Sequence, residues 1–157
     1  MTQDPLRVIR KGLQAYADRG IFRGFSEDDF KHARASFSFQ WMTPRRLQFT
    51  VDASKGVLTF KHLLPNIETG SIIYKDLKRF LLARYDNSLP RHRRIDKKRA
   101  EIVCTNRQGA ISLSLKVRDG QYSYCLKKIV NLVHELFVHL NDSYDDYMCK
   151  NFDARQE

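Results

Sequence analysis

"SFSFQWMTPRRLQFTVD", residues 36 to 52, alternates apolar and polar side chains on both sides of a turn. Successive side chains of a β-strand point to opposite faces, so this period of two predicts two half-buried strands. Pro44 occupies a favoured position in the turn between them. One face of this pair is expected to carry Phe37, Phe39, Trp41, Leu47, Phe49 and Val51. The stretch therefore predicts an antiparallel sheet with one buried face.

Three further segments show the strand pattern. "VLTFKH", residues 57–62, follows the "DASKG" connection and completes a three-stranded meander. "AEIVCTN" (100–106) and "AISLSLKV" (110–117) are expected to pair across the turn "NRQG". In the last of these, aliphatic residues alternate cleanly with serine and lysine.

Helical periods flank and interrupt these strands. A first helix is expected to be capped by Asp4, to begin at Pro5 and to end at Gly20. "SEDD" at Ser26 has the form of a capping box and predicts a second, short helix. A third helix is expected to follow Ser71, and a fourth to run from Ser123 to about Leu140.

The predicted fold is α+β, in the order α-βββ-α-ββ-α with the short extra helix near the start. We expect an antiparallel sheet of about five strands, with the N-terminal helix and two further helices packed on one face. No linker or repeat interrupts the pattern, so residues 1–157 are expected to form a single domain. The helical residues predicted to pack on the aromatic and aliphatic face of the sheet are Leu77, Phe80, Leu81, Ile129, Val133, Leu136 and Phe137.

Positive charge is concentrated in the middle of the chain. The formal net charge is +10, and residues 75–99 hold ten lysines and arginines against three aspartates. From Leu140 onward five acids face two bases, so the end of the chain is acidic. This asymmetry indicates either a polyanionic partner for the middle or an acidic tail folded over it.

The strongest candidate for phosphate binding is the stretch "PRHRRIDKKR", residues 90–99. Its connection, from residue 86 to about 98, is longer than usual, which is typical of functional or mobile loops. The alternative is a loop that is solvated or paired internally, with the acidic tail or with Asp28 and Asp29. The proposed phosphate-binding residues are Arg79, Arg84, Arg91, Arg93, Arg94, Lys97, Lys98 and Arg99.

A second candidate surface is the polar face of the sheet. Small polar residues occupy the outward positions of every predicted strand pair, so this face is expected to be open. We expect it to contact a partner through Gln40, Gln48, Thr50, Ser112 and Ser114.

Signatures of catalysis and metal binding are absent from the sequence. In "HELFVH", His134 and His139 are five residues apart, about 140° around a helix, whereas a zinc-binding HExxH pair needs a spacing of four. "KGVLTF" lacks the outward aromatic rings that an RNA-binding RRM sheet requires. Cys104 and Cys125 fall on apolar faces, where thiols are usually inert. We therefore expect no enzyme, no metal and no cofactor.

The order of elements over residues 5–140 resembles the type III secretion chaperone-like fold, shared with YbjN-like bacterial proteins. The resemblance implies a small, usually dimeric, non-enzymatic protein that holds extended partner segments. This chain departs from the secretion chaperones in being basic where they are typically acidic.

The sequence thus predicts a bacterial-type binding or adaptor protein that engages a protein partner or forms a homodimer. The alternative is a nucleic-acid-binding protein that places its basic stretch on phosphates. Three well-separated cysteines favour reduced thiols and a cytoplasmic location. No run of about 18 apolar residues is present, so a membrane partner is not expected.

Overall fold

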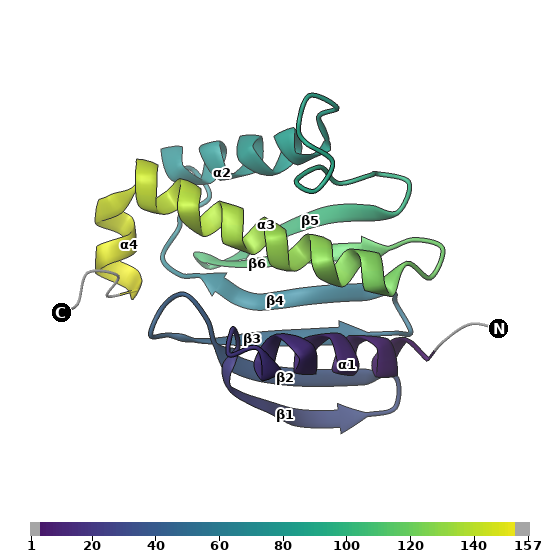
Figure 1. Ribbon diagram of the computed structural model, residues 1–157. Coiled ribbons are helices and arrows are strands. Elements are labelled where there is room, and N and C mark those ends of the chain that lie inside the picture. The colour runs from purple at the N-terminus through teal and green to yellow at the C-terminus, as the bar shows by residue number, and fades with distance from the viewer. Residues whose placement is uncertain (1–3, 153–157) are drawn as a thin grey trace.

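A six-stranded antiparallel sheet with helices on one face forms the computed structural model, which describes residues 4–152 (Figure 1). The helices are α1 (Pro5–Asp18), α2 (Ile72–Leu82), α3 (Tyr122–Ser143) and α4 (Asp145–Phe152), with a 3-10 turn η1 at Ala83–Tyr85. The strands are β1 (Arg23–Lys31), β2 (Arg34–Gln40), β3 (Arg46–Asp52), β4 (Val57–Leu64), β5 (Ala100–Arg107) and β6 (Ala110–Val117). The predicted α+β class is confirmed.

The strands lie in the order β1-β2-β3-β4-β6-β5, with every neighbouring pair antiparallel. All five predicted strands are present, and the sixth is β1 at the edge. Figure 1 shows α1 over the β1 side of the sheet and α3 over the β4 and β6 side, with α2 near β5.

The short helix predicted from Ser26 is wrong, because residues 23–31 form strand β1. The local acids that mimic a helix start serve other contacts here: Ser26 Oγ donates to Asp28, and Glu27 binds Arg10 of α1. Phe25 stacks on Phe37 of β2 with ring centroids 5.8 Å apart. Cross-strand pairing and this aromatic contact therefore outweigh the capping signal.

The start of α1 follows the sequence prediction. Asp4 caps the helix, with Oδ1 accepting from the Leu6 N–H at 3.2 Å, and Pro5 occupies the first turn. Gly20 lies just beyond the end of the helix with φ of +78°, a conformation that costs glycine little.

One hydrophobic core joins the helices to the sheet. The helical residues expected to pack there are buried, apart from Phe80, which is half-buried at the margin. Their partners on the sheet, including Phe39, Phe49 and Leu115, are fully buried. The aromatic alternation that opens the sequence therefore builds the core rather than a surface.

The acidic end of the chain forms α4, a helix that the sequence pattern did not predict. Met148 and Phe152 bury against the core, and the phenolic oxygen of Tyr147 donates to the Pro65 carbonyl at 2.5 Å. Asp153 and Glu157, which the acidic-tail interpretation included, lie outside the described residues. Among the described helices, none is long and apolar enough to cross a membrane.

Candidate functional site

The face of the sheet opposite the helices has a floor of short hydroxyl side chains. In the strand register Ser36 pairs with Thr50, Thr50 with Thr59, and Thr59 with Ser114. These four residues form a row across β2, β3, β4 and β6, perpendicular to the strands. Thr59 Oγ1 and Ser114 Oγ lie 2.8 Å apart and share a hydrogen bond. Because longer side chains flank this row, the floor is lower than its margins.

The floor belongs to a depression of about 920 Å³, which we call the trough. Of the five residues predicted for the partner-binding face, four line it: Gln48, Thr50, Ser112 and Ser114. Gln40 does not, since it lies at the end of β2 and its side-chain amide donates to the Pro44 carbonyl at 2.8 Å. Among the described residues, no Phe, Tyr or Trp lines the trough, and His62 contributes its one aromatic ring.

Cations gather at both ends of the trough. Two stand on the hairpin between β1 and β2, one in the turn after β3, and two toward the far ends of β4 and β5. Within residues 4–152, none of them forms an ion pair. These cations are Lys31, Arg34, Lys55, Lys61 and Arg107.

Two aspartates accompany these cations. Asp52 already accepts hydrogen bonds from the Ser54 hydroxyl at 2.6 Å and from the backbone of Ser54 and Lys55. These bonds, that of Ser54 first, hold the pKa of Asp52 below its ordinary value. Asp29 lies beside Ser36 on β1. The trough therefore keeps an excess of positive charge.

Sequence reasoning missed most of the cationic lining. Lys31 and Arg34 belong to a hairpin whose first strand was read as a helix, and Arg107 lies one residue beyond the predicted strand. Alternation of "RASFSFQ" places Arg34 on the same face as Ser36, and this signal could have found it.

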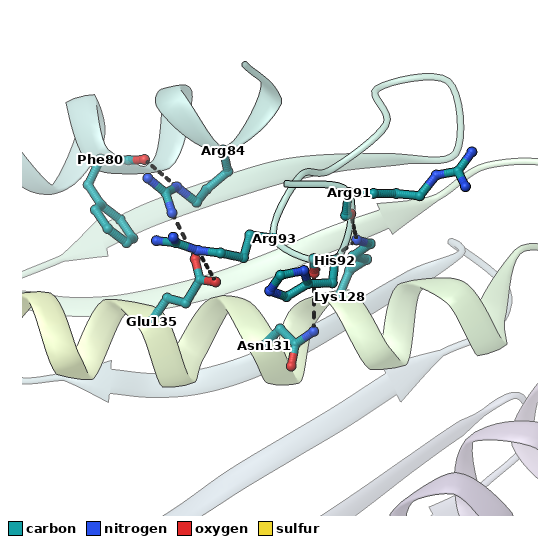
Figure 2. Close-up of polar contacts among 8 residues, drawn as sticks. All are labelled: Phe80, Arg84, Arg91, His92, Arg93, Lys128, Asn131 and Glu135. Carbon is teal, nitrogen blue, oxygen red and sulfur yellow. Dashed lines mark hydrogen bonds and ion pairs between the residues drawn. The ribbon is translucent and has the colours of Figure 1, made fainter. Parts of the chain in front are cut away.

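The basic stretch is partly internal, because it is fastened to α3 by Glu135 (Figure 2). Arg84 is only 7% exposed; its Nη1 donates to Glu135 Oε1 at 2.7 Å and its Nε to the Phe80 carbonyl at 3.2 Å. Arg93 Nε donates to the other carboxylate oxygen at 2.9 Å. One acid thus engages two of the eight predicted phosphate-binding residues, and Arg84 does not lie on the exposed strip.

The other six predicted cations divide by what their side chains contact. Arg94 donates to the Asn87 carbonyl. The guanidinium carbon of Arg99 lies 3.7 Å from the centroid of the Tyr124 ring, and its nitrogens donate to the Gln121 side chain. Lys97 lies over the Tyr85 ring. Arg79 is on α2, 3.8 Å from Asp76 and largely exposed, and Arg91 and Lys98 are exposed on the loop. The interpretation of internal pairing therefore holds for part of the stretch, and the acid that pairs with Arg84 and Arg93 is Glu135 of α3.

Lys128 of α3 also anchors this loop, a contact that no sequence pattern predicts. Its ammonium donates to the carbonyls of Arg91 and His92 at 2.8 and 3.2 Å. Burial, and then the nearby charges of Arg94 and Arg99, lower the pKa of Lys128. Positive charges are therefore crowded on this side of α3.

A groove of about 500 Å³ beside the loop contains both histidines of "HELFVH". His139 Nε2 lies 2.9 Å from Asp76 Oδ2, and its ring stacks on Phe80. The hydrogen bond to His139 is the main cause that lowers the pKa of Asp76. Within residues 4–152 there is no group of three or more histidine, cysteine or acidic residues that could hold a metal ion.

The cysteines on apolar faces are held as thiols. Burial raises the pKa of Cys104 to about 11 and that of Cys125 to about 12. At neutral pH neither group is a thiolate, so neither is activated as a nucleophile.

Both edges of the sheet are protected. β1 carries two register irregularities and the acids of "SEDD", features that disfavour pairing with another strand. At the other edge, the Ile102 N–H of β5 donates to the Tyr85 hydroxyl at 2.7 Å. These features disfavour addition of a strand at the edges, whereas the trough offers side chains to a partner.

Comparison with protein-family models, with curated proteins and with solved structures finds no match to this chain. The likeness to the type III secretion chaperone-like fold stays a prediction from element order.

Proposed function

We propose that this chain is a non-catalytic binding protein that holds a segment of a protein partner in the trough. The observation that carries the proposal is the open, hydroxyl-floored face of the sheet, about 920 Å³ in volume, that no described helix covers. Hydroxyl and amide side chains such as Thr50, Gln48 and Ser114 can donate to and accept from the backbone of a bound chain.

The register constrains how the partner binds. The row from Ser36 to Ser114 crosses the strands, so a segment lying along it meets side chains rather than strand backbone. Addition of a partner strand would instead require an edge, and both edges are protected. A second copy of the chain can supply the segment, which would make the homodimer one form of the same binding.

Selection from a random peptide library on the immobilised protein tests this function. The variant T50W/S114W fills the floor with residues that strands tolerate well, and Q14W places the same ring on the exposed side of α1 as a control. We expect peptides to be enriched on the wild type and on Q14W but lost on T50W/S114W. If the floor-filled variant retains the same peptides, or if no peptide is enriched, the proposal is wrong.

A further inference from the structure

The charge of the trough indicates what kind of segment fits it. Five cations line the trough against two aspartates, and one of these, Asp52, accepts hydrogen bonds from its own turn and also interacts with the charge of Arg34, its cross-strand neighbour. Elsewhere arginines near the sheet do find acids: Arg10 binds Glu27, and Arg118 binds Glu101. The other four cations, Lys31, Lys55, Lys61 and Arg107, form no ion pair within residues 4–152 and are therefore available to an anion from outside the chain.

The spacing of these cations suggests an extended ligand. Arg34 lies on β2 and Arg107 on β5, four strand positions apart in the sheet. With strands about 4.8 Å apart and residues about 3.3 Å apart along them, the two ends are on the order of 25 Å apart. An extended chain covers that distance in about eight residues.

The lining favours a peptide over a nucleic acid. Proteins that hold single-stranded nucleic acid stack its bases on several aromatic side chains, whereas the described lining of the trough has no Phe, Tyr or Trp and a single imidazole, that of His62. Its hydroxyl groups, such as Thr59 and Ser36, instead suit the polar backbone of a peptide. Lys61 and Arg107 can then pair with carboxylates at one end of that peptide, and Arg34 with those at the other.

Resting on the proposed function, we propose that the trough binds an extended acidic segment of a protein partner, about eight residues long. The carboxylates lie against the cations at the two ends, and the backbone crosses the hydroxyl row between them.

Fluorescence anisotropy with a labelled ten-residue peptide of alternating glutamate and serine tests this inference. The same peptide with glutamine in place of glutamate is the neutral probe, and a single-stranded oligonucleotide of ten nucleotides is the competing class. The variant K61E/R107E reverses one end of the trough. R91E/K98E makes the same change in net charge on the exposed loop and is the matched control.

We expect the glutamate peptide to bind the wild-type protein. Its affinity for K61E/R107E should be at least about tenfold lower, and its affinity for R91E/K98E should stay within about twofold of wild type. Its affinity should fall as salt rises. If K61E/R107E does not fold, as judged by circular dichroism, K61Q/R107Q replaces it and should still weaken binding.

Four results would overturn the inference. The glutamine peptide could bind equally well, or the loop variant could lose as much affinity as the trough variant. The oligonucleotide could bind the trough more tightly than the peptide. Light scattering could show a dimer that K61E/R107E dissociates, which would make a second copy the occupant. If the library yields peptides that depend on the floor but are not acidic, the proposed function stands and only this inference fails.

Discussion

At the scale of single residues, the contact that organises the basic loop is the carboxylate of Glu135 between two guanidinium groups. The Arg84 and Glu135 side chains are 9% and 17% exposed, so both charges have lost most of their water. A buried ion pair adds little net stability, but removing one partner leaves the other charge uncompensated. Loss of the Glu135 carboxylate would therefore destabilise the protein mainly by leaving the buried charge of Arg84 without a counter-charge.

We predict that E135Q lowers the free energy of unfolding by about 2 kcal/mol, because Arg84 keeps its burial and loses its counter-charge. Replacing both partners, as in R84M/E135L, should recover most of this loss, since neither buried side chain then carries a charge. Urea denaturation measures both variants.

The matched control is E101Q, which breaks the exposed pair with Arg118, whose side chains are 50% and 40% exposed. It should change stability by less than about 1 kcal/mol. Equal losses for E135Q and E101Q would contradict the prediction and mean that burial of the Glu135 pair has no special cost.

At the scale of elements, the packing of α1 on α3 depends on a glycine inside a helix. Gly12 lies in the middle of α1, where glycine is a poor helix former. A Cβ at this position would overlap Leu126 Cδ2 of α3, so this terminal methyl group would have to shift within the core, where Leu126 is only 3% exposed. The glycine is therefore explained by the approach of the second helix.

We predict that G12A destabilises the protein, although alanine is the better helix former by about 1 kcal/mol. Overpacking a core site costs about 1–3 kcal/mol, and this should exceed the gain in propensity. In the double-mutant cycle with L126A, the G12A penalty should disappear, because the smaller side chain leaves room for the new methyl group. If G12A alone raises the urea midpoint, the two helices do not pack as closely as described.

The elements that the sequence predicted are those whose hydrophobic period is regular. α1, α2, α3 and five strands all show such a period, and each is present. β1 shows no regular period because Phe25, which packs against the core, and Phe30, which lies under Arg10 of α1, share the helix side although they are an odd number of residues apart. An irregularity between Glu27 and Asp29 allows this spacing, and it hides the period of two.

For the candidate site, the alternation of apolar and polar residues predicts only which face of the sheet each side chain occupies. Alternation predicts Thr50 and Ser114 on the open face because each lies between inward apolar residues of its own strand. Their alignment in one row with Thr59 depends on register between strands, which alternation does not give. The pairing of Arg84 with Glu135 joins residues 51 positions apart and has no local signal at all.

At the scale of the whole molecule, positive charge lies on two separate surfaces. One is the trough on the open face of the sheet, and the other is the loop that lies along α3 (Figure 2). Glu27 of the β1 edge binds Arg10 of α1, on the side of the sheet away from the trough. The net charge of +10 is therefore not one continuous patch, and the two surfaces can be tested independently.

For the alternative function, binding of nucleic acid by the loop, we predict that no more than about six phosphates are engaged. Glu135 engages Arg84 and Arg93, which leaves six of the eight predicted cations: Arg79, Arg91, Arg94, Lys97, Lys98 and Arg99. Each neutralised phosphate of duplex DNA contributes about −0.9 to the slope of log affinity against log salt, so six cations give at most about −5.4. Anisotropy of a labelled duplex across a salt series measures this slope.

R91E/K98E should abolish most of this binding, while K61E/R107E in the trough should leave it nearly unchanged. A slope near −7, the value of about eight engaged phosphates, would contradict the prediction, because Arg84 and Arg93 would then have to leave Glu135. Absence of duplex binding at low salt would also contradict it. The loop cations would then serve only internal pairing and solvation. Since the two double variants change the net charge equally, a difference between them can come only from where the charges lie.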